Sequence, residues 1–256
     1  MPVPATMRSD AAELAEVFSS VQGEGLLLGC RQVFIRFLGC NLRCDYCDTN
    51  VGVAVDTCRM ELTPGRHDFR MLANPVDMQQ VIALLERWQG GWPKVHHSIS
   101  LTGGEPLLHV DLLHAWLPRL RAHLPVHLET NGVLPAALAK VVKEIDYISM
   151  DIKLPSSSGE TSLWEHHQEF LEVAAAADTA VKVVVNASTE HWEIERAARM
   201  IACIDADMPL IIQPETAADL TIRISPLALI ELQEIAAAIL ADVRIIPQTH
   251  RFIGLL

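Results

Sequence analysis

Residues 32–49 join an apolar run to a loop with three cysteines, and they read Gln32-Val33-Phe34-Ile35-Arg36-Phe37-Leu38-Gly39-Cys40-Asn41-Leu42-Arg43-Cys44-Asp45-Tyr46-Cys47-Asp48-Thr49. The run from residue 32 to 37 is apolar on both sides except for Arg36, a pattern typical of a central strand covered on both faces. The cysteines follow at the spacing C-x3-C-x2-C, among residues too polar for core packing. The stretch therefore predicts a strand that presents three thiolates beyond its carboxyl end.

These three thiolates, Cys40, Cys44 and Cys47, are candidate ligands of a metal centre. Soft thiolates select zinc or iron–sulfur clusters, and both usually take four protein ligands. A [4Fe–4S] cluster on three cysteines would leave one iron open to a small molecule. Zinc would need a fourth ligand from farther away, such as Cys58, Cys30 or His67, and the spacing is not a common zinc spacing. The residues alone favour the cluster and leave zinc or a redox pair open.

A second motif, Thr102-Gly103-Gly104-Glu105-Pro106, follows the apolar run 98–101. Two glycines after a strand let the backbone approach a ligand and direct its amides toward it. Glu105 offers a carboxylate to a cation. A strand-ending turn explains this motif when it stands alone, but beside a three-cysteine loop both motifs have a joint explanation in one bound ligand.

Together the two motifs resemble the radical S-adenosylmethionine (SAM) superfamily, whose cluster motif is C-x3-C-x-aromatic-C, with Tyr46 as the aromatic residue here. In that superfamily the methionine end of SAM chelates the open iron, and the GGE motif holds its ammonium group. Further motifs are similar to those of the 7-carboxy-7-deazaguanine synthases of 7-deazapurine (queuosine) biosynthesis: Gln22-Gly23-Glu24-Gly25, Asp48-Thr49, Glu129-Thr130-Asn131-Gly132 and Gln248-Thr249-His250-Arg251. The resemblance runs from about Glu16 to Leu256.

The resemblance implies a lyase-type enzyme that converts 6-carboxy-5,6,7,8-tetrahydropterin to 7-carboxy-7-deazaguanine, by ring contraction with loss of ammonia. It implies three cofactors, which are a [4Fe–4S] cluster, S-adenosyl-L-methionine and Mg²⁺. The 5′-deoxyadenosyl radical from SAM would start the reaction by taking hydrogen from C6 of the pterin. The protein itself would orient and shield this chemistry.

The resemblance also implies which residues bind the cofactors. It assigns the cluster to Cys40, Cys44 and Cys47, and magnesium to Thr49, whose oxygen suits a hard cation when substrate and water supply the other oxygens. The residues implied for SAM are Tyr46, Thr102, Gly103, Gly104, Glu105, Glu129, Asp151, Lys153 and Gln213. Many relatives have Ser-Pro-Lys where this chain has Asp151-Ile152-Lys153, so the contact to the ribose is the least defined of these.

On the substrate side, Arg36 must find a partner because an unpaired buried charge is very costly. It can form a structural ion pair, or it can grip a substrate carboxylate with its planar guanidinium. The resemblance favours the second role. The residues that it assigns to the pterin are Gln22, Glu24, Arg36, His250 and the terminal carboxylate of Leu256. It implies catalytic roles for Glu24, Arg36 and Thr49. The chain departs from the family pattern at Arg251, where lysine is usual.

Strands and helices alternate along the rest of the chain, which predicts a parallel sheet covered by helices. Polar motifs follow several strands, so we expect an α/β fold of the incomplete TIM-like barrel type, mainly parallel, with its site at the carboxyl ends. The expected strands are 15–20, 32–37, 98–102, 126–129, 147–151, 181–186, 210–213 and 243–246. The expected helices are 111–122, 135–143, 163–176, 190–203 and 226–240, with another that starts at Asn74-Pro75. We expect one domain, 1–256, with residues 1–14 as a mobile extension, 51–72 irregular and 155–159 a flexible loop.

Composition limits the class of protein. The 256 residues carry a net charge of −12, which argues against a nucleic-acid surface. No apolar run reaches the ~18 residues of a membrane span, and the start lacks a secretory signal, so we expect a cytoplasmic protein. Residues 31–70 hold six arginines against five acids. We interpret Arg43, Arg59, Arg66 and Arg70 as a basic patch that docks an acidic flavodoxin or ferredoxin, and we take a homodimer as the default assembly.

Two alternatives remain. An activase that makes a glycyl radical in a partner enzyme also uses C-x3-C-x2-C, but it would not explain residues 22–25, the Asp48-Thr49 pair or the histidine tail. A non-catalytic zinc or electron-transfer module would leave the GGE motif without a role. A requirement for a partner protein would indicate the first alternative, and bound zinc the second.

Overall fold

The chain folds around one large sheet in the computed structural model, which describes residues 10–47 and 55–255. Ten strands lie in the order β12-β11-β10-β9-β8-β7-β3-β2-β4-β5. Their bounds are β2 (Leu14–Val21), β3 (Arg31–Phe37), β4 (Thr57–Glu61), β5 (Phe69–Ala73), β7 (Ser98–Gly103), β8 (Val126–Thr130), β9 (Tyr147–Ile152), β10 (Asp178–Val185), β11 (Leu210–Pro214) and β12 (Val243–Ile245).

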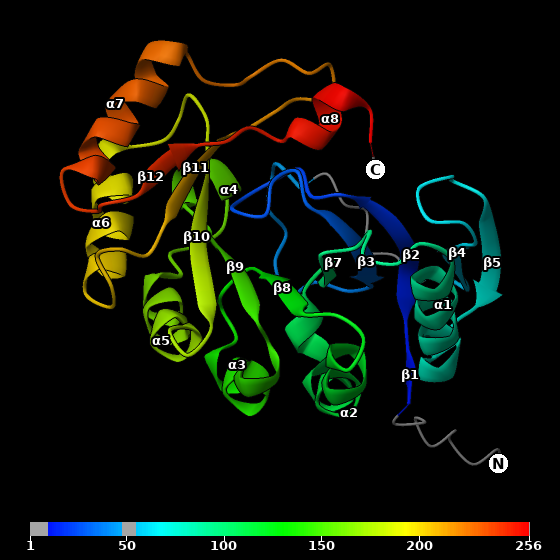
Figure 1. Cartoon of the computed structure of the whole chain (residues 1–256). Coiled ribbons are helices and arrows are strands. Elements are labelled where there is room, and N and C mark those ends of the chain that lie inside the picture. Colours follow the sequence, from blue (N-terminus) through cyan, green and yellow to red (C-terminus); the bar gives the residue numbers. More distant parts are fainter. Residues whose placement is uncertain (1–9, 48–54, 256) are drawn as a thin grey trace, which may run out of the picture.

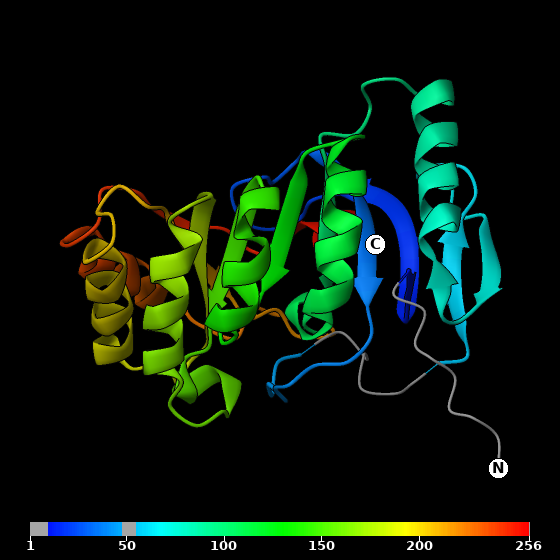
Figure 2. The ribbon, with the colours of Figure 1, turned by 90° about the horizontal axis from the view of Figure 1, so that it is seen from below.

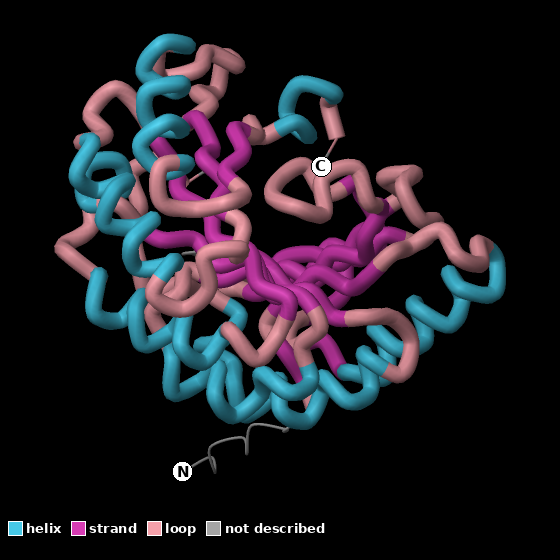
Figure 3. Tube along the Cα trace, turned by 60° about the vertical axis from the view of Figure 1, so that its left-hand side comes forward, coloured by secondary structure: helices cyan, strands magenta, loops and turns pink. Residues whose placement is uncertain are grey.

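The central strands are parallel, as their continuous apolar sequences predict. Strand β3 pairs in parallel with β7, and each next pair out to β11 and β12 is also parallel, whereas β2 runs antiparallel to β3. The sheet curves strongly, but β12 and β5 remain its two edges, so the barrel does not close (Figures 1 and 3). The expected incomplete barrel is confirmed, and the parallel strands end at one rim.

Helices cover the outer face of this sheet, as Figure 2 shows from below. Each presents an apolar face at helical spacing; α2, for example, buries Leu113, Trp116, Leu117 and Leu120. The covering helices are α1 (Met78–Gly91), α2 (Val110–Arg121), α3 (Pro135–Val141), α5 (Trp164–Ala174), α6 (His191–Ala202) and α7 (Pro226–Ala237). Short helices η1 (Pro106–His109), η2 (Val142–Glu144), α4 (Pro155–Ser158) and α8 (Thr249–Ile253) complete the described chain. None of these helices is long and apolar enough to cross a membrane.

Several local predictions were wrong. The segment expected to be irregular contains the antiparallel hairpin β4–β5, where Cys58 and Met60 alternate into the core. Of the expected mobile extension, β1 (Ala11–Ala12) pairs with β6 (Val76–Asp77), and residues 1–9 lie outside the described residues. Helix α1 begins three residues later than Asn74-Pro75 predicts, because Asp77 caps it with a capping box. The expected loop 155–159 contains the turn α4.

Candidate active site

A cavity of about 700 Å³ lies at the rim where the parallel strands end. This volume is in the range of small-molecule sites. The sequence-predicted residues that line it are Gln22, Glu24, Arg36, Cys40, Cys44, Tyr46, Cys47, Thr102, Gly103, Gly104, Glu129, Asp151, Lys153, Gln213 and His250. Glu105 does not line it, whereas Thr49 and Leu256 lie outside the described residues. Residues from most of the chain's length thus meet in one place.

The cysteine loop follows β3, as predicted, and three contacts fix its backbone. The Asp45 amide donates to the carbonyl of Ser158 in α4 (2.9 Å), and the Arg43 amide donates to Glu160 (2.5 Å). The Cys47 amide closes a turn onto the Cys44 carbonyl (3.1 Å). The segment after β9, which the sequence predicts only as a flexible loop, therefore supports the cysteine loop.

The chemistry of this donor set fits a cluster with soft ligands. Cys40 and Cys47 are exposed, Cys44 is half-buried, and all three line the cavity. No three metal-ligating side chains converge on one point among residues 10–47 and 55–255. Cys58, one candidate for a fourth zinc ligand, is instead buried in the core. A group large enough to span the loop suits the three thiols better than a single ion.

The glycine turn lies against the cysteine loop. The Gly104 amide donates to the Phe37 carbonyl (3.2 Å), and the Glu105 amide donates to the Gly39 carbonyl (2.9 Å). Gly103 has φ +120°, and a Cβ there would lie 2.3 Å from the Phe37 carbonyl oxygen. Only glycine permits this approach of the turn to the backbone of Phe37. The amides of Gly104 and Glu105 donate to carbonyls of the chain itself, so the expectation that they are directed at a ligand stays a prediction.

Glu105 has a different position from the one that its motif predicts. Its side chain is fully buried and accepts hydrogen bonds from the amides of Leu107 (3.0 Å) and Asn131 (2.8 Å) and from the Thr130 hydroxyl (2.9 Å). Burial raises the pKa of this carboxyl to about 6, although the same hydrogen bonds act to lower it. Glu105 therefore ties the glycine turn to the end of β8 from behind the cavity wall.

Glu129 lines the cavity, but donors surround its carboxylate. The Ser100 hydroxyl (2.6 Å) and the Gln22 amide nitrogen (2.9 Å) donate to one oxygen, and the Thr102 hydroxyl (3.0 Å) donates to the other. Gln22 in turn accepts the Glu24 amide (3.0 Å) on its side-chain oxygen. Glu129 thus orients the Gln22–Glu24 loop as well as facing the cavity.

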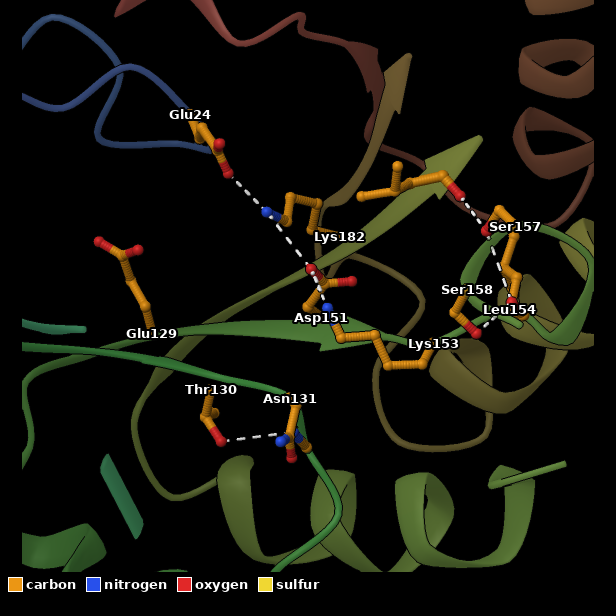
Figure 4. Close-up of polar contacts among 12 residues, drawn as sticks. Glu24, Glu129, Thr130, Asn131, Asp151, Lys153, Leu154, Ser157, Ser158 and Lys182 are labelled. Atoms are coloured by element: carbon orange, nitrogen blue, oxygen red, sulfur yellow. Dashed lines mark hydrogen bonds and ion pairs between the residues drawn. The ribbon is translucent and has the colours of Figure 1, made fainter. Parts of the chain in front are cut away.

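A chain of charged side chains crosses the cavity floor from Glu24 through Lys182 and Asp151 to Lys153 (Figure 4). Lys153 Nζ lies 2.8 Å from Asp151 Oδ2 and 5.2 Å from the centre of the Tyr46 ring. Three cavity-lining residues have a buried side-chain atom without a hydrogen-bond partner in the part of the chain that the structure describes: the Tyr46 hydroxyl, Asp151 Oδ1 and Gln213 Oε1. Such orphaned acceptors suit the hydroxyl or amino groups of a ligand.

Arg36 donates to Glu16 through Nε (2.9 Å), and it also lines the cavity. Arg59 Nη1 lies 3.5 Å from the other oxygen of Glu16, and Arg59 also lines the cavity. Its neighbour on the hairpin, Arg70, lines a different groove. Two residues of the predicted basic patch thus line different hollows, and the structure adds Glu16 and Arg59 to the site.

The C-terminal segment contributes Gln248 and His250 to the wall of the cavity. Thr249 donates to the Gly23 carbonyl through its amide and its hydroxyl (both 3.0 Å). A Cβ on Gly23 would lie 2.1 Å from His250 Nδ1. The tail thus packs directly on the glycine loop, and only the absence of a side chain at Gly23 leaves room for His250.

Replacing Gly23 with alanine should displace His250 and raise the KM for the substrate about tenfold, because overpacking here costs about 1–3 kcal/mol. Steady-state kinetics measures the KM, and hydrogen exchange of residues 248–255 reports the displacement. The matched control is Gly90→Ala, since a Cβ at Gly90 meets nothing within 4 Å. An unchanged KM with faster exchange in the tail would show that His250 does not contact substrate.

Sequence reasoning missed Lys182, Glu16 and Arg59. Lys182 is the one charged residue of the run Val181-Lys182-Val183-Val184-Val185, which is the same signal that marks Arg36. Glu16 lies on β2, where only tertiary pairing with β3 and β4 brings it beside both arginines. The role of Lys182 could be inferred from the sequence, whereas the positions of Glu16 and Arg59 at the cavity could not.

Comparison with known proteins gives a consistent result. The sequence profile of the radical SAM superfamily matches residues 34–193. A 7-carboxy-7-deazaguanine synthase of Geobacter sulfurreducens is 59% identical over 248 residues, which cover 97% of this chain and 99% of that protein. A synthase of the same name from Methanothermobacter thermautotrophicus is 35% identical, with 95% and 98% covered. The crystal structure of QueE from Escherichia coli shares the fold, with TM-score 0.56, 18% identity and 93% of each chain covered.

Proposed function

This chain belongs to the 7-carboxy-7-deazaguanine synthase family of the radical SAM superfamily, and from that premise we propose that its cavity converts 6-carboxy-5,6,7,8-tetrahydropterin to 7-carboxy-7-deazaguanine. One observation carries the proposal. The cysteine loop, the glycine turn and the motif residues Gln22, Glu24, Arg36 and His250 line a single cavity. Neither a glycyl-radical activase nor a zinc module accounts for the last group.

As a radical SAM enzyme the protein uses a [4Fe–4S] cluster and SAM, which together supply the radical that starts the reaction. Cys40, Cys44 and Cys47 would hold the cluster, and the backbone at Gly103 and Gly104 would receive the methionine end of SAM. The oxygen of Asp151 that has no hydrogen-bond partner among the described residues would accept a ribose hydroxyl. Glu105 contributes from behind the wall, by fixing the turn.

On the substrate side, the guanidinium fork of Arg36 would bind the pterin carboxylate in a two-point geometry. The carboxylate of Glu24 would accept N–H groups of the aminopyrimidine ring, since its charge is held in place by Lys182 and by Gln248 (2.9 Å). His250 would close this side through the tail. The proposal of a Mg²⁺ ion on Thr49 rests on the sequence motif.

The test is anaerobic turnover with SAM, Mg²⁺, a reductant and the pterin, with mass spectrometry of the deazapurine and of 5′-deoxyadenosine. Both products are expected from the wild type. Arg36→Met should raise the KM for the pterin about 10- to 100-fold, since a lost charged hydrogen bond costs about 1.5–3 kcal/mol. Arg70→Met, in the other groove, is the matched control and should leave the KM unchanged. Deoxyadenosine without deazapurine from the wild type would overturn the substrate assignment.

For partners we propose a flavodoxin or ferredoxin as electron donor, a homodimer and a cytoplasmic location. Arg43 and Arg66 are exposed and remain available to an acidic donor, while Arg59 belongs to the cavity. Helix α7 exposes Leu227 and Ile230, which a second copy of the chain would cover. A reducing compartment keeps the cluster thiolates intact. Sedimentation of the holoenzyme checks the dimer.

A further inference from the structure

Lys182 joins two carboxylates that face different parts of the cavity. Its ammonium group lies 2.5 Å from Glu24 Oε2 and 3.4 Å from Asp151 Oδ2. The side chain is 17% exposed, and it projects from β10, where the run 180–185 is otherwise apolar. Glu24 belongs to the glycine loop on the substrate side, whereas Asp151 lies at the end of β9 on the SAM side. No motif of the sequence joins these two regions.

The contacts extend in both directions from this lysine. Gln248 of the tail donates to the other oxygen of Glu24 (2.9 Å), and Lys153 donates to the same oxygen of Asp151 that faces Lys182 (2.8 Å). Two cations and two carboxylates thus balance in a region largely removed from water, where an unpaired charge would be very costly. The balance makes the four positions interdependent.

Electrostatics supports this interdependence. Burial alone would raise the pKa of Glu24, but the charge of Lys182 and the hydrogen bonds from Lys182 and Gln248 lower it to about 2. Burial likewise acts to lower the pKa of Lys182, and the two carboxylates raise it above its ordinary value. Glu24 therefore stays charged because of Lys182, and Lys182 is the cation that Glu24 shares with Asp151.

We propose that Lys182 is a positioning residue that couples the two ligand sites, so that pterin bound at Glu24 tightens the binding of SAM at Asp151. The coupling rests on the proposed function, which places the pterin and SAM at these carboxylates. N–H donors of the pterin would hydrogen-bond to the Glu24 carboxylate and weaken its ion pair with Lys182. The lysine can then close its 3.4 Å contact with Asp151.

The closer contact would fix the orientation of the Asp151 carboxylate. Oδ2 already accepts a hydrogen bond from Lys153, and the buried Oδ1 has no hydrogen-bond partner among the described residues, so Oδ1 is the oxygen that can accept from SAM. An acceptor held in place loses less conformational freedom when a hydroxyl of SAM binds to it. By linkage, SAM must tighten pterin binding by the same factor. Relatives with serine at position 151 would lack the ion pair between Lys182 and Asp151.

The test is calorimetric titration of SAM into the anaerobic, cluster-loaded protein without reductant, with and without saturating pterin. The wild type should bind SAM about fivefold or more tightly when pterin is present, the lower end of typical coupling. Lys182→Met keeps the length of the side chain and removes the charge, and it should bring this ratio to about one. Lys182→Arg, which keeps the charge, should restore part of the ratio. The control, Lys143→Met on the exposed surface, should keep the full ratio.

Lys182→Met leaves two carboxylates without their shared cation, which disfavours folding, so a second variant is needed to test the proposal. The double variant Glu24→Gln with Lys182→Met removes one charge of each sign and should fold with a ratio of about one. A wild-type ratio in a folded Lys182→Met or in the double variant would overturn the proposal, as would a ratio of one in the wild type. Failure of the wild type to bind pterin at all would overturn the proposed function as well, whereas pterin binding without coupling would overturn this inference alone.

Discussion

Replacing Gly103 with alanine is expected to lower the free energy of unfolding by about 3 kcal/mol or more and to abolish measurable SAM binding. The residue has φ +120°, where side chains are strained, and the new Cβ would lie 2.3 Å from the carbonyl oxygen and 2.6 Å from the nitrogen of Phe37. Phe37 cannot move away, because it pairs with Gly103 at the end of the β3–β7 ladder. The turn must therefore leave the cavity wall.

Urea denaturation measures the first effect, and equilibrium binding of SAM to the cluster-loaded protein measures the second. Gly90→Ala is the control, since its Cβ meets open space within helix α1, and its stability should rise slightly. A folded Gly103→Ala protein that bound SAM within threefold of the wild type would show that the backbone of this turn does not contact SAM.

The residues that contact the cavity from strand ends could be predicted from the sequence. Parallel strands end at one rim, so motifs that follow β3, β7, β8 and β9 must meet there whatever the details of the helices. The direction of each side chain is a different matter. Glu105 follows its strand as predicted, yet its carboxylate faces Thr130 and Asn131, because their donors satisfy it inside the protein.

What could not be predicted depends on pairing between distant segments. Glu16 faces Arg36 and Arg59 only because β2 lies between β3 and β4 in the sheet. In the hairpin β4–β5, strand β5 (Phe69–Ala73) has no buried residue and no regular alternation of apolar and polar residues, so its sequence gives no clear strand signal. Lys182 was readable as a charge in an apolar strand, but its two partners come from residues 24 and 151, and only the folded sheet brings them together.

Buried histidines predict a second large effect, loss of stability in mild acid. His96 stacks on Trp88 and hydrogen-bonds to the Ser19 hydroxyl (2.8 Å), and burial, aided by the charge of Arg31, lowers its pKa to about 4. Burial also lowers the pKa of His167 to about 4. Below pH 6.5 these two histidines bind protons in the unfolded chain but stay neutral in the folded state. The folded state therefore loses stability as the pH falls.

The size of this loss follows from the pKa shifts. Between pH 7 and 4.5 each of the two histidines should remove about 2.5 kcal/mol from the free energy of unfolding. Glu105 acts in the opposite direction, because its pKa of about 6 lets the folded state bind a proton at a higher pH than the unfolded chain does. This adds about 1.5 kcal/mol to the free energy of unfolding over the same range. Together these three groups give a loss of about 3.5 kcal/mol. Burial also lowers the pKa of His127, which adds to the loss, and Glu24 adds most of its own loss below pH 4.5.

His96→Gln should keep a hydrogen bond to Ser19 and cannot titrate, so its stability should fall by about 2.5 kcal/mol less than that of the wild type between pH 7 and 4.5. Urea denaturation at several pH values in that range measures the slope for each protein. The control is His114→Gln on the exposed face of α2, whose slope should match that of the wild type. Ring stacking on Trp88 contributes equally at every pH, so its loss would lower the free energy of unfolding at all pH values without changing the slope against pH. Equal slopes for His96→Gln and His114→Gln would show that His96 is not the group that titrates.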